Sequence, residues 1–188
     1  MQEFIDNSDG KDKQDCEINA SKRWVDNFNN QTEKKLIMLG DDLYSREPMI
    51  QNILDKKHSY IFVAKPTSHK YLYEQIEMIR NLGTLDTKKQ EKIVHGKKQI
   101  TTYSYINDVM IKSSQGKKVQ SLTTNWCEVI VTNVNGKKLY HNCFITNIPL
   151  HANNVADIIQ AGRTRWKIEN EKKRKRNIDY RSFSREFN

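Results

Sequence analysis

Two adjacent aspartates follow a short apolar run, and their position suggests metal chemistry. The run Leu36–Leu39 stops at Gly40 and is typical of a buried strand, which delivers Asp41 and Asp42 at its carboxyl end. A carboxylate at the opening of a strand–helix–strand crevice is placed to hold a hard divalent cation such as Mg²⁺, which prefers oxygen ligands. The same pair also suits a turn or a helix cap, and the pattern alone leaves both interpretations open.

A second acid for such a cation is available near the carboxyl end of the sequence. Spacings of three, four and seven separate four residues that share one face of a helix: Gly162, Arg165, Glu169 and Arg176. Glu169 is the candidate ligand. An ordinary i, i+4 surface pair between Arg165 and Glu169 explains the same spacing without chemistry.

Other familiar signatures of catalysis or metal binding are absent from the sequence. The five histidines show neither an H-E-x-x-H pattern nor paired ligand spacing, and we interpret them as surface or core residues. No G-x-G-x-x-G, Walker A or G-x-S-x-G motif occurs. The three cysteines are odd in number and widely spaced, which indicates neither a disulfide framework nor a zinc finger and fits a reducing cytoplasm.

The charge of the chain is strongly basic and unevenly distributed. Its net charge is +9 and its pI is about 9.4, which predicts affinity for polyanions, with nucleic acid as the leading partner. Residues 160–188 hold ten of the Lys and Arg residues against four acids. The cluster Lys172–Arg176 is either a solvated charge run or a phosphate-binding segment without sequence readout.

The apolar spacing in the amino-terminal half predicts a strand–helix–strand unit. Strands are expected over 36–39 and 60–64, with a helix over 48–56 between them, and this order implies parallel pairing. A helix over 15–30 precedes the unit, and Ser68 is expected to cap a third helix after it.

The middle of the chain has a different pattern, rich in Thr, Tyr, Val and Ile. Between Lys88 and Asn147 we expect antiparallel strands with turns at His95-Gly96 and Asn135-Gly136. Asn-Gly between two such runs is the strongest short-range hairpin signal. A last helix is expected to open at Asn153 or Asn154.

The length of 188 residues makes one domain the default, and 36% hydrophobic residues indicate a folded but thinly cored chain. No apolar run approaches the roughly 20 residues of a membrane span, and the start lacks a signal peptide, so neither membrane nor secretion is expected. Four segments are expected within the chain: 1–87, a β-rich segment 88–148, a helix 149–176 and an irregular tail 177–188.

Five short motifs stand in one order along the chain. They are residues 2–5 and 9–17 with Lys22–Trp24, LGDDLY at 39–44, residues 65–69, NWCE at 125–128 and AGRTRWKIENE at 161–171. Together they resemble bacterial insertion-sequence transposases of the DDE type. The resemblance covers nearly all of residues 1–171.

The resemblance implies a fold, a reaction and site residues. In this family a ribonuclease H-like α/β core with a β-rich insertion carries two Asp and one Glu, which bind two Mg²⁺ or Mn²⁺ ions for phosphodiester cleavage and strand transfer. It implies that Asp41 is the second Asp, with Asp42 as the register alternative, and that Glu169 is the Glu. Segment 88–148 corresponds to the insertion, and 1–87 to part of the core.

The family's helix signature, Y-x2-R-x3-E-x6-K, is matched in part. Arg165 and Glu169 fit it, while Gly162 replaces the usual Tyr and Arg176 the usual Lys. In related enzymes the flanking residues contact DNA near the scissile phosphate. The DNA-binding residues implied here are Arg163, Arg165, Trp166, Lys172, Lys173 and Arg176.

Two departures from the family lead to our first hypothesis. The family's first catalytic Asp belongs to an earlier strand, and no strand is expected here before Leu36; the basic tail after Glu171 looks like a frameshifted one. The chain is therefore interpreted as a truncated transposase that does not cut DNA alone. Double-stranded DNA of mobile-element ends, a second copy or a full-length transposase are its expected partners, in a bacterial, nucleoid-associated cytoplasmic setting. The alternative is a non-catalytic basic module that binds DNA or inhibits a transposase.

Overall fold

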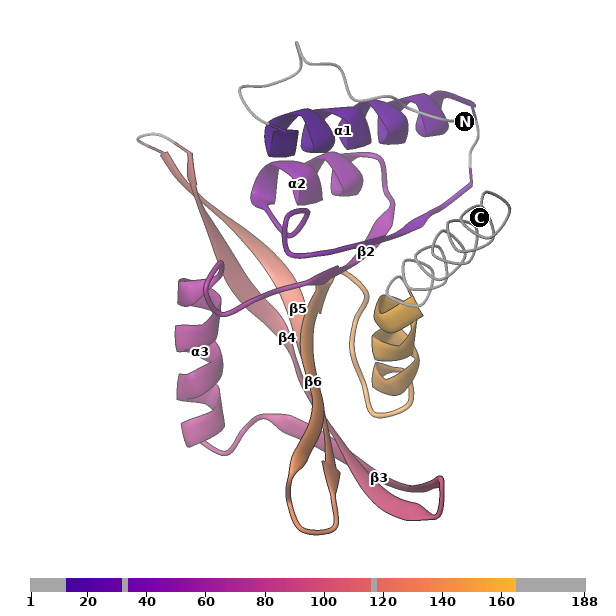
Figure 1. Cartoon of the computed structure of the whole chain (residues 1–188). Coiled ribbons are helices and arrows are strands. Elements are labelled where there is room, and N and C mark those ends of the chain that lie inside the picture. The colour runs from indigo at the N-terminus through magenta and orange to yellow at the C-terminus, as the bar shows by residue number, and fades with distance from the viewer. Residues whose placement is uncertain (1–12, 32–33, 116–117, 165–188) are drawn as a thin grey trace, which may run out of the picture.

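A computed structural model describes residues 13–31, 34–115 and 118–164, which build one six-stranded sheet with helices against both of its faces (Figure 1). The strand order is β1-β2-β6-β5-β4-β3. Strand β1 (Ile37–Gly40) pairs in parallel with β2 (Ser59–Val63), and all other neighbouring strands are antiparallel. The sheet is therefore mixed, and the expected α/β class is confirmed.

The strand–helix–strand unit predicted from the apolar spacing is present. Helix α2 (Glu47–Asp55) joins β1 to β2, and Pro48 stands in its first turn, where its fixed φ and missing N–H are tolerated. The side chains of Met49, Ile50 and Ile53 are fully buried. Their spacing of one and three residues puts one face of α2 on the sheet, which explains why this short helix is held in place.

The β-rich middle of the chain is antiparallel, as predicted, and the structure divides it into four strands. They are β3 (Asp86–Val94), β4 (Lys97–Gln115), β5 (Lys118–Asn133) and β6 (Lys138–Thr146). His95 and Gly96 connect β3 to β4 and both have positive φ. Gly136, in the turn between β5 and β6, has a φ of +77°, which only glycine adopts without cost.

Two apolar clusters lie on opposite faces of the sheet. Helices α1 (Lys13–Gln31), α2 and α3 (Lys70–Asn81) contribute to the first, which includes Val25, Phe62, Leu72 and Trp126. The helix over 155–164 covers the other face, drawn in orange and yellow in Figure 1, and contributes to the second cluster. Strand β2 is thus covered on both faces, as its continuous apolar sequence requires.

One expected helix start is wrong, that of α3, and one is made more precise, that of the last helix. Ser68 does not cap α3, which begins at Lys70 with His69 in the N-cap position and no side-chain cap. The hydroxyl of Ser68 instead binds Asp42, so a tertiary contact takes the group that the local pattern assigned to the helix. The last helix follows Asn154, whose side-chain oxygen accepts a hydrogen bond from the His151 N–H at 2.9 Å.

Among the helices in the described part of the chain, none combines the length and the apolar character needed to cross a bilayer.

Candidate functional site

Asp41 lies directly after β1, at the carboxyl end of the parallel strand pair. Its Oδ1 accepts a hydrogen bond of 3.0 Å from the Leu43 N–H, and its carbonyl accepts one of 3.2 Å from the Tyr44 N–H. Both bonds turn the chain sharply away from the sheet. The residue is partly exposed, so the turn-forming role leaves the carboxylate within reach of solvent.

Asp42 has a different set of contacts, which join two loops. Its Oδ1 accepts a hydrogen bond of 2.7 Å from the Lys65 N–H, and its Oδ2 accepts one from the Ser68 hydroxyl. Lys65 and Ser68 belong to the loop between β2 and α3. The Asp42 side chain therefore holds the loop after β1 against the loop after β2, a role other than the turn or helix cap that the sequence pattern allowed.

A buried polar contact lies beneath Asp42. The Ser45 hydroxyl donates to the Asp42 carbonyl at 2.7 Å and lies 2.6 Å from His69 Nε2. Because the single hydroxyl proton goes to the carbonyl, Nε2 of His69 is the donor to Ser45. Burial lowers the pKa of His69, Asp42 opposes this shift, and Arg46 adds to it. His69 is consequently a neutral, structural histidine.

The folded chain should lose stability as the pH falls through the range in which His69 would be protonated. An unfolded histidine has a pKa of about 6.5. Because the pKa in the folded state is lower, the unfolded state binds more protons, and the free energy of unfolding decreases as the pH drops below about 6.5. Urea unfolding across this range should show a shallower decrease for His69→Gln. Some decrease should persist, because the pKa of buried His58 is lowered too.

The exposed His95 supplies the control for this measurement. His95→Gln, in the β3–β4 turn, should reproduce the wild-type dependence of unfolding free energy on pH. An unchanged slope in His69→Gln would contradict the buried, neutral state of His69.

The helix over 155–164 approaches β2 and β6 through Gly162. A Cβ atom on Gly162 would lie 2.6 Å from Cε1 of Phe144 and 3.1 Å from Cγ2 of Ile61. The next residue, Arg163, stacks its guanidinium on the Tyr140 ring at 4.2 Å from the ring centroid. Leu39, two residues before Asp41, packs in the same cluster as this helix. The helix thus contacts β2 and β6 and shares its apolar cluster with the end of β1, just before Asp41.

Six of the expected site residues lie outside the described residues, so their positions relative to Asp41 are not part of the structure. They are Arg165, Trp166, Glu169, Lys172, Lys173 and Arg176. Of the expected DNA-binding residues, Arg163 is described, and its guanidinium is stacked as given above.

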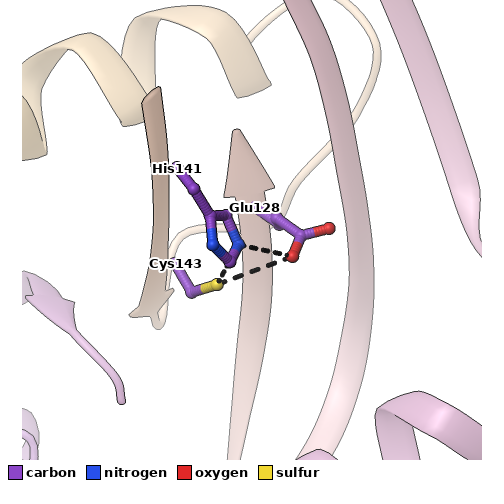
Figure 2. A group of neighbouring side chains, drawn as sticks. All are labelled: Glu128, His141 and Cys143. Atoms are coloured by element: carbon purple, nitrogen blue, oxygen red, sulfur yellow. Dashed lines mark hydrogen bonds and ion pairs between the residues drawn. The ribbon is translucent and has the colours of Figure 1, made fainter. Parts of the chain in front are cut away.

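Sequence reasoning missed one group of metal-ligand side chains, Glu128, His141 and Cys143, which meet on β5 and β6 (Figure 2). Along the sequence the five histidines show no paired ligand spacing and the cysteines form no C-x-x-C pair, so neither residue type indicates this group. Burial raises the pKa of Cys143 to about 12, so its sulfur is a thiol in the metal-free chain. The signal that could have found the group is the hairpin register set by the Asn135-Gly136 turn.

Comparison with known proteins does not assign the site. No protein-family model matches the sequence, and no curated protein matches it significantly.

Proposed function

We propose that this chain is part of a DDE-type transposase, in which Asp41 and Glu169 serve as metal-binding acids for DNA cleavage and strand transfer. The observation that carries the proposal is the place of Asp41, at the carboxyl end of β1 in a parallel β1–α2–β2 unit. Ligand sites of open α/β sheets lie outside such strand ends. We also propose that the fold is a partial ribonuclease H-like core with a β-rich insertion, as the resemblance implies.

The resemblance assigns the metal-ligand role to Asp41, and the contacts of Asp42 give that residue a structural role. Asp42 accepts hydrogen bonds from the Lys65 N–H and the Ser68 hydroxyl with different oxygens and so joins two loops. Asp41 is partly exposed and offers carboxylate oxygen, the ligand type of Mg²⁺ and Mn²⁺. A bound pair of such ions supplies an activated water or 3′-hydroxyl nucleophile and stabilises the leaving oxygen.

The packing of the last described helix also supports the proposal. The helix over 155–164 contacts Ile61 of β2 through Gly162 and runs toward residue 169 in sequence. It shares an apolar cluster with Leu39, which stands in β1 just before Asp41. The described helix that precedes Glu169 in sequence is therefore packed in the same apolar cluster as the end of β1.

The chain alone is expected to be inactive in cleavage. Among the described residues no strand precedes β1, and so none supplies the additional Asp of the triad. Two metal ions a few ångströms apart need bridging and flanking carboxylates together, so Asp41 and Glu169 by themselves do not hold the pair.

Translation of the flanking DNA in every frame, followed by assay of the joined chain, tests the proposal. We expect an upstream strand that ends in Asp-Gly and an apolar helical continuation downstream. The joined chain should nick supercoiled DNA in Mg²⁺, while the 188-residue chain should not. Asp41→Asn and Glu169→Gln should each reduce nicking to background, because each removes one metal ligand.

Asp55→Asn provides the matched control for these variants. Asp55 is an exposed acid at the end of α2 that binds only the Gln51 side chain among the hydrogen bonds described, so nicking should persist. Flanks that encode neither missing piece, or nicking that survives Asp41→Asn, would contradict the proposal.

The second candidate function, a non-catalytic DNA-binding or transposase-inhibiting module, is favoured by the β3–β4 hairpin. This hairpin is largely exposed and carries five lysines against Asp86 and Glu91. If the flanks encode nothing further, binding to duplex DNA that survives EDTA and weakens steeply with salt would support this candidate.

A further inference from the structure

Three side chains of unlike chemistry meet on one face of the β5–β6 pair. Glu128 in β5 stands directly opposite Cys143 in β6, and His141 is two residues before Cys143 on the same face. Figure 2 shows the imidazole of His141 and the sulfur of Cys143 both directed toward the Glu128 carboxylate. One ligand atom from each residue lies within 4.8 Å of the other two.

The distances between these atoms resemble those of a tetrahedral zinc site. Cys143 Sγ lies 3.6 Å from His141 Nε2 and 3.8 Å from Glu128 Oε1. Bond lengths of about 2.3 Å for Zn–S and about 2.1 Å for Zn–N and Zn–O give tetrahedral separations of about 3.6 Å for both. The third separation, 2.8 Å between His141 Nε2 and Glu128 Oε1, is a hydrogen bond and would widen to about 3.4 Å around zinc.

A neighbouring cation holds the glutamate in this position. Arg80 on α3 donates to Glu128 Oε2 at 3.1 Å, which leaves Oε1 directed at His141 and Cys143. Such an outer contact fixes the orientation of a ligating carboxylate. The negative charges of Glu128 and a Cys143 thiolate would together balance the charge of Zn²⁺, and Arg80 would remain beside the site as one additional positive charge.

Burial differs around the cluster in a way that suits metal entry. Glu128 and Cys143 are buried, whereas 38% of the His141 side chain is exposed. A metal would reach the site past His141, and a fourth coordination position on that side would be open to water. Three protein ligands with one open position are common in zinc sites that keep a bound water.

We propose that Glu128, His141 and Cys143 bind one Zn²⁺ ion, with water as the fourth ligand. Binding breaks the His141–Glu128 hydrogen bond: the proton on Nε2 of His141 leaves to solvent while Nδ1 takes one up, so that a neutral imidazole binds zinc through Nε2. The thiol proton of Cys143 passes to solvent as the Zn–S bond forms. The thiolate and imidazole select zinc or a similar transition metal over Mg²⁺. This site is independent of the Asp41 site, so neither result decides the other.

Titration of the full chain with Co²⁺ tests the proposal, because cobalt reports thiolate ligation directly. We expect one equivalent of Co²⁺ to produce a thiolate-to-cobalt charge-transfer absorption in the near ultraviolet. Zn²⁺ should displace the cobalt, and Mg²⁺ in large excess should not. Cys143→Ser should abolish the absorption, and His141→Gln and Glu128→Gln should weaken Zn²⁺ binding about 100-fold or more, since even outer-sphere changes cost 10–100-fold.

Matched controls separate this site from other cysteines and histidines. Cys127→Ala removes the buried thiol next to Glu128 on the opposite sheet face, and Cys16→Ser removes the third cysteine of the chain. His95→Gln changes an exposed turn histidine. All three should retain the absorption and the Zn²⁺ affinity.

Two results would overturn the proposal. The first is the absence of a charge-transfer absorption in the wild-type chain at saturating Co²⁺, which needs no variant. The second is an absorption that persists in Cys143→Ser or disappears in Cys127→Ala or Cys16→Ser. Circular dichroism establishes whether each variant is folded. If Cys143→Ser does not fold, His141→Gln decides, because it changes a partly exposed side chain. Loss of Zn²⁺ affinity in His141→Gln would support the proposal, and unchanged affinity would overturn it.

Discussion

Gly162→Tyr is expected to lower the free energy of unfolding by about 3 kcal/mol or more, because the sheet leaves no room for a side chain at this position. A Cβ atom would already lie 2.6 Å from the Phe144 ring, which is fully buried, and 3.1 Å from Ile61. Neither neighbour is at the end of a flexible surface side chain. The helix must therefore move off the sheet or the ring must leave its position.

Tyrosine is the informative substitution because it is the usual residue in the signature that the helix resembles. In this chain the Phe144 ring occupies the space beside Gly162. A larger residue at position 162 therefore clashes with the ring unless Phe144 is replaced by a smaller residue. Phe144→Ala combined with Gly162→Tyr should be less destabilising than the sum of the single changes, since removal of the ring frees volume.

Urea unfolding followed by far-ultraviolet circular dichroism measures the effect. Gly162→Ala should cost less than Gly162→Tyr, because overpacking of about 1–3 kcal/mol is offset by up to about 1 kcal/mol of helix propensity. Gln160→Tyr places the same ring on the exposed side of the helix and should be nearly neutral. A stable Gly162→Tyr chain would contradict the close contact of helix and sheet.

The strand–helix–strand unit was predictable because each of its parts is specified locally. Continuous apolar runs such as 60–64 have to be covered on both faces, and Pro48 marks a helix start that depends on no distant contact. The Asn135-Gly136 turn similarly predicts its hairpin from two residues. These elements agree with the structure to within a few residues.

The hydrogen bond between Ser68 and Asp42 was not predictable, because it depends on a contact between two loops. Ser68 stands where a helix cap is expected, yet its hydroxyl binds a carboxylate 26 residues away in sequence. Local patterns assign such groups to the nearest backbone donor. Only the parallel pairing of β1 and β2 brings these loops together.

The Glu128, His141 and Cys143 cluster lay within reach of sequence reasoning. A two-residue turn at Asn135-Gly136 pairs Glu128 with Cys143, and this pairing is observed. The observed turn is longer than two residues. An irregularity between Val131 and Thr132 shifts the register by one residue, so Glu128 still pairs with Cys143. Alternation then puts His141 on the same face. The three residues come from two paired strands, so a search for ligand spacing along the sequence does not find them.

Trp126→Ala is expected to cost about 3–5 kcal/mol of unfolding free energy, the range for removal of a large buried aromatic side chain. Trp126 has no exposed surface and lies opposite Ile145 in the β5–β6 pair. Its ring meets the Tyr73 ring of α3 edge to face, with centroids 6.3 Å apart. The residue therefore joins α3 to the sheet, and the cavity left by alanine cannot be filled by one neighbour.

The expected loss is large compared with the 5–15 kcal/mol that stabilises a typical domain. Trp126→Phe keeps an aromatic ring against Tyr73 and should cost clearly less, since much of the volume is retained. Trp24→Ala tests a tryptophan that is only partly buried and stacks on Phe28 at 5.6 Å, so its cost should also be smaller.

Urea unfolding monitored by far-ultraviolet circular dichroism avoids the change in fluorescence that removal of a tryptophan causes. The slope of unfolding free energy against urea should stay constant if the variants remain two-state. Because Trp126 is two residues from Glu128 on the same face, alanine there should also loosen the support of that glutamate by α3 and Arg80. A cost below about 1 kcal/mol would mean that α3 is not packed on the sheet through this side chain.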